Sequence, residues 1–224
     1  MRSPSLTRRS EHAGGRLCHW YDWRGRSVLV CDSARNMLLV IELFADKELE
    51  PEDKYQILLA MLFPDPAEAL GMAGGDINDL IACVLWDACG LDVTGTKPHE
   101  RAVFDWESDA PRIQASIMSA YGITWDQAAD GLLFADVCAL LGELVEDDGQ
   151  TPFAQAIYYR TAKPPRRTKY NGEQCDAWSA RRSHFALKAA DASPADAMEE
   201  QNNRSRDLFA ALKAVAKGAE VGNV

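Results

Sequence analysis

The sequence lacks a long hydrophobic segment. A membrane-spanning helix needs about 20 consecutive apolar residues, but the longest apolar stretch, residues 36–45, is about half that length and contains Glu42. The N-terminus carries arginines, yet no apolar core of a signal peptide follows them. These two features predict a soluble, cytoplasmic protein.

Cysteine and histidine are sparse and scattered. The chain has six cysteines and four histidines, with no C-x-x-C pair. The pair Cys18-His19, together with Cys31, comes nearest to a metal-ligand set, but it lacks a second ligand pair at zinc-site spacing. A disulfide framework is not expected at this length and in this context. We therefore predict no disulfides, no metal and no other cofactor.

The motifs of common enzymes are missing as well. The sequence has no G-x-x-x-x-G-K-[ST], G-x-G-x-x-G, H-E-x-x-H or G-x-S-x-G. The glycine-rich residues 71–76 precede a helical pattern, but they lack the strand and the lysine of a phosphate-binding loop. They are interpreted as a helix break and cap. The sequence therefore predicts that the protein is not an enzyme.

Negative charge dominates the chain, and it is unevenly distributed. Residues 27–159 hold 24 Asp and Glu against six Lys and Arg, whereas residues 160–188 hold eight Lys and Arg against two acids. The basic segment either folds back on the acidic body or stays solvated. The alternative is a nucleic-acid site, in which Tyr170 and Trp178 would accompany the cations. The acidic body would repel the same phosphates.

Helical periodicity, with caps and breaks, runs through most of the chain. It predicts helices over about 34–45, 51–62, 66–72, 77–89, 107–120, 125–144 and 152–160. We therefore predict an all-α fold with at most one short N-terminal strand, near residues 28–30. About five helices would form a single body.

The predicted organisation has four parts. Residues 1–22 form a disordered basic arm, and residues 23–160 form the helical body. Residues 161–169 form a basic, proline-rich linker. Residues 170–224 form a C-terminal helical extension.

Residues 104–127 contain four carboxylates that are candidates for acid–base chemistry. A catalytic pair would need one carboxylate in an apolar pocket, and nothing in the sequence indicates such a pocket. Acidic side chains stabilise the first turn of a helix, and helix starts account for all four: Asp105, Glu107, Asp109 and Asp126. Gly122 ends the first helix in a left-handed conformation, and Thr124 caps the next. The stretch is therefore interpreted as a corner between two helices.

The order of segments also carries a family resemblance. The segments are Arg35–Leu39, DKELEPEDKYQILLAML (46–62), DWESDAPRIQASIMSAYGI (105–123), LLFADVCALLGEL (132–144) and EDDGQTPFAQAIYYR (146–160). In this order they resemble the bacteriophage gene-product-fifteen family of Gram-positive phages and prophages. The motif positions are Asp105, Asp109, Ala110, Ile113, Tyr121, Gly122, Ile123 and Arg160. Leu133 departs from the pattern, because the family has a tryptophan there.

The resemblance implies a tail assembly chaperone-like role that is not enzymatic. Such a protein binds the tape measure protein while a long non-contractile tail assembles, and it is expected to be absent from the mature virion. The tail tube protein and further copies of the chain along the client are additional candidate partners. Two alternatives stay open: a structural virion protein, and a helical nucleic-acid-binding regulator that uses residues 160–188.

Overall fold

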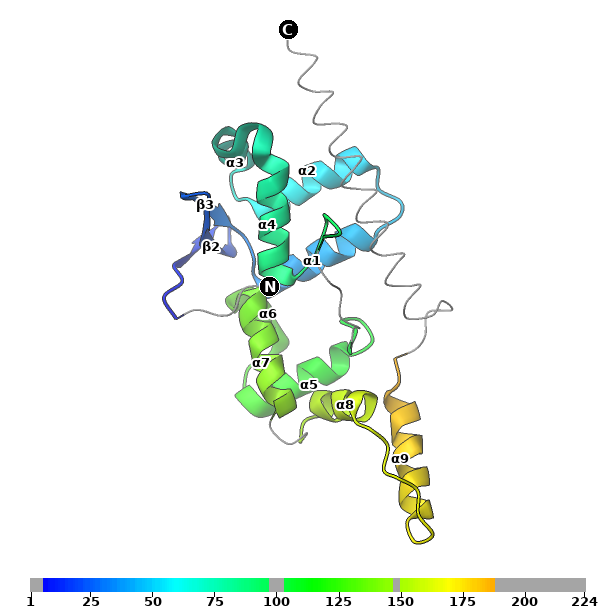
Figure 1. The fold of residues 1–224 in the computed structure, drawn as a ribbon. Coiled ribbons are helices and arrows are strands. Elements are labelled where there is room, and N and C mark those ends of the chain that lie inside the picture. Colours follow the sequence, from blue (N-terminus) through cyan, green and yellow to red (C-terminus); the bar gives the residue numbers. More distant parts are fainter. Residues whose placement is uncertain (1–5, 97–102, 147–149, 188–224) are drawn as a thin grey trace. The chain divides into compact units, whose positions relative to one another are not determined.

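The computed structural model forms two compact units. It describes residues 6–96, 103–146 and 150–187 (Figure 1). Unit 1 comprises residues 6–96 and 126–137, and unit 2 comprises residues 103–125, 138–146 and 150–187. The predicted features in residues 1–5 and 188–224, including most of the C-terminal extension, lie outside the described residues.

The all-α prediction is wrong, because unit 1 begins with a three-stranded antiparallel sheet. The strands are β1 (Ser10–Ala13), β2 (Arg16–Trp23) and β3 (Arg26–Val30), in the order β1-β2-β3 (Figure 1). The predicted strand near residues 28–30 is the end of β3. Residues 10–22, which the sequence placed in a disordered arm, form β1 and most of β2.

Two tight turns explain why this segment folds as a meander. Gly14 and Gly15 connect β1 to β2, and both have positive φ, at 57° and 77°. Arg24 and Gly25 connect β2 to β3 with φ of 49° and 76°. A two-residue turn with positive φ at both positions matches the twist of the flanking strands. The glycines therefore direct hairpins here rather than disorder.

One face of the sheet is buried against α4 (Ile77–Cys89). The register pairs His19 with Val30 and Tyr21 with Val28, and all four side chains are buried. The Tyr21 hydroxyl donates to Asp87 at 2.9 Å, and the Trp23 indole donates to Asp79 at 3.2 Å. Both acceptors belong to α4, so the aromatic side chains of β2 fix the sheet on that helix.

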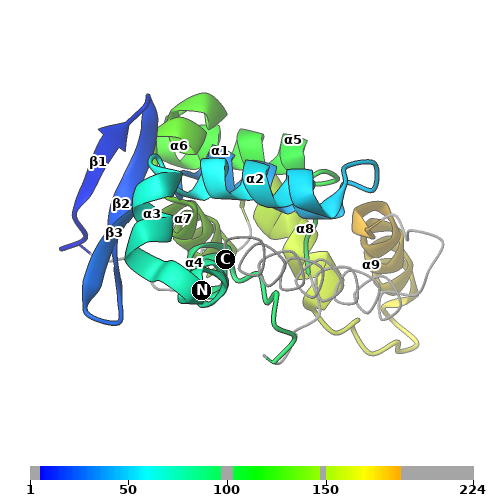
Figure 2. The same ribbon diagram turned by 90° about the horizontal axis from the view of Figure 1, so that it is seen from above.

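The helices between the sheet and α4 largely follow the predicted boundaries. They are α1 (Ala34–Ala45), α2 (Pro51–Leu62), α3 (Pro66–Ala73) and the 3-10 turn η1 (Gly74–Asp76) (Figure 2). Ser33 caps α1 by accepting from the Asn36 amide, as Ser does at helix starts. Within the glycine-rich residues 71–76, which were interpreted as a break and cap, Asp76 occupies the N-cap position of α4, but its side chain accepts no capping hydrogen bond.

Residues 66–89 together have the length and mean hydropathy of a membrane-crossing helix, against the sequence-based expectation. The chain is not straight there, because Gly74 has φ 56° and ψ −132° and separates α3 from α4. The apolar face of α4 is buried in unit 1, through Ile77, Leu80, Ile81, Val84, Leu85 and Ala88. These features are those of a core helix with a preceding short helix.

The single helix predicted over residues 125–144 is two helices, α6 (Trp125–Gly131) and α7 (Phe134–Glu146). Residues 132–134 pair instead with residues 32–34. The Ala34 amide donates to the Leu132 carbonyl at 3.0 Å, and the Phe134 amide donates to the Asp32 carbonyl at 2.9 Å. This long-range antiparallel bridge outweighs local helix propensity.

Unit 2 contains α5 (Ala110–Tyr121), α8 (Pro152–Thr161), α9 (Gly172–Phe185) and the later turns of α7. Thr151 caps α8 by accepting from the Ala154 amide, and Pro152 occupies its first turn. The α8 helix packs on α5, and α9 packs on α8. Gly122 ends α5 with φ 68°, which confirms the predicted left-handed cap.

Candidate functional site

The family-motif residues of the sequence gather at the two ends of α5 rather than at one site. Asp105, Asp109 and Arg160 meet at its N-terminal end. Tyr121, Gly122 and Ile123 lie at its C-terminal end, where the Tyr121 hydroxyl donates to the Leu140 carbonyl at 2.8 Å. The helix has 12 residues, which span roughly 18 Å at 1.5 Å per residue. The motif therefore contains two separate structural elements.

The first element is a buried ionic cluster, the Asp109 cluster, made of Asp105, Asp109, Arg112 and Arg160. The Arg160 guanidinium donates to both carboxylate oxygens of Asp109, at 2.6 and 2.8 Å. Arg112 adds a third bond at 2.9 Å, and the Asp105 amide a fourth at 3.1 Å. Asp109 is 0% exposed. Asp109 occupies the N-cap position of α5, but its carboxylate binds arginines instead of capping amides.

Arg160 joins three segments of unit 2 through the same guanidinium. It donates to the Phe185 carbonyl at the end of α9, at 2.5 Å, and to the Val103 carbonyl at 3.2 Å. Arg112 lies over the ring of Phe185, at 5.4 Å from its centroid. The Asp109 cluster therefore holds the C-terminal end of α9 against α8 and the start of α5.

Electrostatics keep this cluster ionised. Burial acts to raise the pKa of Asp109, but the hydrogen bonds from Arg160, the Asp105 amide and Arg112 outweigh it, so the pKa of Asp109 is lowered from its ordinary value. A carboxylate held in this state cannot act as a general acid near neutral pH. The geometry indicates a structural ion pair.

The Asp109 cluster supports an open groove between α8 and α9. The groove has a volume of about 730 Å³ and is lined by Gln155, Tyr158, Tyr159, Ala180, Arg181, His184 and Phe185. Tyr159 stacks on Phe185, with ring centroids 5.5 Å apart and planes within 8°. Arg181 donates to the Tyr159 hydroxyl at 2.8 Å. Tyr158 is 54% exposed. Aromatic and arginine side chains of this kind are enriched at protein interfaces.

A second exposed surface lies on α1 and α2 in unit 1. Each helix exposes an apolar side chain near carboxylates, and we define the α1–α2 surface as Leu39, Glu42, Glu52, Asp53 and Ile57. None of its three carboxylates forms an ion pair within the described part of the chain. The surface is therefore acidic and partly apolar, and its carboxylates are open to solvent.

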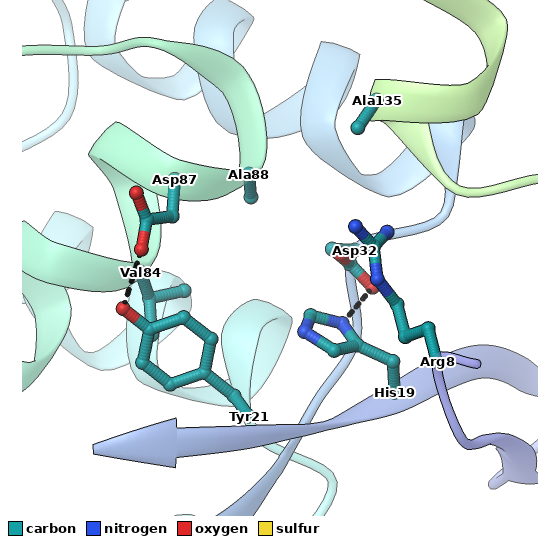
Figure 3. A pocket seen from close by; sticks show the side chains of 8 residues that line it. All are labelled: Arg8, His19, Tyr21, Asp32, Val84, Asp87, Ala88 and Ala135. Atoms are coloured by element: carbon teal, nitrogen blue, oxygen red, sulfur yellow. Dashed lines mark hydrogen bonds and ion pairs between the residues drawn. The ribbon is translucent and has the colours of Figure 1, made fainter. Parts of the chain in front are cut away.

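Unit 1 also contains a buried polar pair that the sequence did not indicate. His19 Nδ1 lies 2.7 Å from an Asp32 carboxylate oxygen, and both side chains are almost fully buried. Figure 3 shows the pair beside Tyr21 and Asp87, with Arg8 pointing toward Asp32. The cavity that they line has a volume of about 10 Å³, which is room for about one water molecule. A space this small cannot admit a substrate.

Within the described residues, no group of three or more His, Cys, Asp and Glu could hold a metal ion. Cys18 and Cys31 are both buried free thiols. Burial, with a hydrogen bond and Coulomb repulsion from Cys18, raises the pKa of Cys31 to about 12. Such a thiol is a poor nucleophile. The exposed features of the described residues are the groove and the α1–α2 surface.

Sequence reasoning missed three buried polar residues, which are Ser116 in unit 2 and His19 and Asp32 in unit 1. Ser116 is fully buried on α5 and accepts from the Phe153 amide at 3.0 Å, which fixes the start of α8. Its spacing from Ile113 on the apolar face was the available signal. The contact between His19 and Asp32 had no signal, because it depends on the unrecognised sheet.

Comparison with protein families gives a match over most of the chain. Residues 16–187 match the family model described as Bacteriophage Gp15 protein. No curated protein and no solved structure matches the chain. The matched segment includes β2 and β3, both ends of α5, and the Asp109–Arg160 pair. Since the match covers more than half of the sequence, the chain belongs to the Bacteriophage Gp15 protein family.

Proposed function

We propose that this phage protein is a tail assembly chaperone-like protein that binds the tape measure protein while a long non-contractile tail is built. The proposed role is non-enzymatic and belongs to the cytoplasm of the bacterial host. The family assignment supports a phage role, and the exposed α1–α2 surface supports binding as its chemistry. That surface is the observation that carries the proposal.

The client that fits the α1–α2 surface is a helix with a basic and an apolar face. Leu39 and Ile57 are 46% and 38% exposed and would contact apolar side chains of such a helix. Glu42, Glu52 and Asp53 would pair with its Lys and Arg, which favours basic stretches of the client over acidic ones. A small surface of this kind gives roughly micromolar binding per copy, and many copies along one client supply avidity.

A pull-down with the tape measure protein tests the proposal. The full chain should retain the tape measure protein. A variant with Glu42→Lys, Glu52→Lys and Asp53→Lys should retain much less, while Glu68→Lys on α3 should behave as the wild type. Equal retention by all three proteins would remove the α1–α2 surface from the proposal.

Mass spectrometry of purified particles separates the chaperone from a structural virion protein. A chaperone is present in infected cells and absent from finished tails, whereas a virion protein persists in them at a fixed copy number. Detection of the chain at a stoichiometric level in mature particles would contradict the proposal.

A further inference from the structure

The helices α8 and α9 and their connection, which form and flank the groove, hold more positive charge than the described carboxylates neutralise. Within the described residues, the ion pairs of α8, α9 and their connection use Arg160 and Arg167. Five further cations of this region have no carboxylate partner among the described residues: Lys163, Arg166, Lys169, Arg181 and Arg182. Of these five, Arg181 lines the groove, and an anionic occupant would gain attraction there without competing with a described carboxylate.

The groove also has apolar side chains that the described residues leave partly exposed. Of the residues of α9, Cys175 is the one that is buried, so the helix buries little apolar surface of its own. Tyr158 is half exposed, and Tyr159 and Phe185 present stacked ring edges beside Arg181. A suitable occupant combines a bulky apolar side chain with neighbouring carboxylates.

The connection between α1 and α2 has this chemistry. We call residues 46–50, of sequence DKELE, the tip. Leu49 is 37% exposed, and Glu48 and Glu50 on either side of it are exposed too. Neither of these glutamates forms an ion pair within the described residues.

The tip is also held in one conformation. The Asp46 carboxylate accepts from the Glu48 and Leu49 amides, at 2.7 and 2.9 Å. Lys54 donates to the Asp46 carbonyl, and Pro51 starts α2 directly afterwards. A loop that is ordered before binding loses less conformational entropy when it docks.

We propose that the groove of one copy binds the tip of a second copy. Leu49 of one chain packs on Tyr158 and Phe185 of the other, and the carboxylates of Glu48 and Glu50 pair with Arg181 and Arg182. Charge complementarity between two parts of one sequence, with the exposed leucine between the acids, favours a second copy as the occupant. This inference goes beyond the proposed function, because it concerns contacts between copies and not the client.

The contact joins two different surfaces, so it is heterologous. After one such contact forms, one copy still has a free groove and the other still has a free tip. Association therefore continues until a ring closes or an open filament forms. The surface is small, so contacts between free copies are weak. The α1–α2 surface lies outside the tip as defined, and its residues are not consumed by the contact.

Sedimentation velocity on the full chain, over a wide concentration range and at low salt, tests the proposal. The wild type should show a weight-average mass that rises with concentration and falls with added salt. Leu49→Ala should weaken association about tenfold, or about 1.4 kcal/mol. Leu70→Ala removes a leucine of similar exposure, 40% against 37% for Leu49, from α3 and should leave the association unchanged.

Charge reversal supplies a second test, in which a mixture of two variants shows whether a loss of association comes from misfolding. The tip variant carries Glu48→Arg and Glu50→Arg, and the groove variant carries Arg181→Glu and Arg182→Glu. Each should be monomeric alone. An equal mixture should associate, because the groove of the tip variant and the tip of the groove variant are both unaltered. A monomeric wild type at all concentrations, or a mixture that stays monomeric while the wild type associates, would overturn the proposal.

Discussion

The carboxylate of Asp109 and the guanidinium of Arg160 are 51 residues apart in the sequence and form two hydrogen bonds, of 2.6 and 2.8 Å, inside unit 2. The Asp109 side chain is 0% exposed and the Arg160 side chain 9% exposed. Two parallel bonds between a carboxylate and an arginine fix orientation as well as distance. This pair therefore sets the position of the end of α9, and with it the shape of the groove.

Removing one partner of the pair should destabilise the protein strongly. Arg160→Met leaves a buried carboxylate with Arg112 as its remaining cation, and Asp109→Leu leaves a buried guanidinium. Each should lower the free energy of unfolding by about 3–5 kcal/mol. The double variant should lose less unfolding free energy than the two single variants lose in sum. Urea unfolding of the wild type, the two single variants and the double variant measures the difference.

An exposed pair of the same chemistry provides the control. Arg167 and Asp176 form an ion pair with an N–O distance of 2.8 Å, and their side chains are 66% and 63% exposed. Arg167→Met should therefore change the unfolding free energy by less than about 1 kcal/mol. If Arg160→Met lowered the unfolding free energy no more than Arg167→Met does, the buried pair would not be organising unit 2.

The pKa of Asp109 predicts an acid limit to this stabilisation. Since its folded-state pKa is lowered, the contribution is fully present above the unfolded value of about 3.9 and is lost as pH falls through the folded value. The stability gap between the wild type and Asp109→Asn should therefore stay constant from pH 7 to about pH 4 and narrow below it. Chemical unfolding over this pH range measures the gap. A gap that closes near pH 6 would mean that the pKa is raised instead.

Gly122 should resist substitution for a backbone reason alone. Its φ is 68°, and an added Cβ would meet no atom within 4 Å. Gly122→Val should lower the unfolding free energy by about 1 kcal/mol or more, because a β-branched residue is strained in this conformation. Gly122→Asn should cost less, since Asn tolerates it better. Equal melting temperatures for Gly122→Val and the wild type would contradict the left-handed geometry.

The Cys31 thiol should be unreactive in the folded protein. Its pKa is raised to about 12 by burial and by Cys18, and the thiolate is the reactive form. Iodoacetamide at pH 8 should modify Cys31 at least about a hundredfold more slowly in the native protein than after unfolding. Peptide mass spectrometry after timed labelling gives the rates. Rapid native labelling of Cys31 would show that the β2–β3 region opens readily.

The sequence predicted most helices of this fold and failed where distant segments pair. The boundaries of α1 and α2 were correct, because Ser33, Pro51 and the apolar periodicity are local signals. The sheet was missed, although Gly14-Gly15 and Arg24-Gly25 carried the pattern of two-residue hairpins. The break between α6 and α7 could not be read locally, since it depends on the bridge between Ser33 and Leu133.

The candidate surfaces were less predictable than the helices. Asp109 and Arg160 were both identified as motif positions, but nothing local shows that they form a pair across 51 residues. The groove depends on how α9 packs on α8, and the mean hydropathy of α9 gives little indication of a buried face. Charge segregation was readable from the sequence, and the structure adds which carboxylates and cations have no ion-pair partner among the described residues.

The soluble fraction of the tape measure protein, measured with and without this chain in the same host cell, tests the chaperone proposal most directly. The account predicts that the tape measure protein alone is insoluble or degraded. With the full chain it becomes soluble and co-purifies, and the variant with Glu42→Lys, Glu52→Lys and Asp53→Lys rescues it less well. If the full chain neither raises the soluble fraction nor co-purifies with the tape measure protein, the chaperone proposal is contradicted.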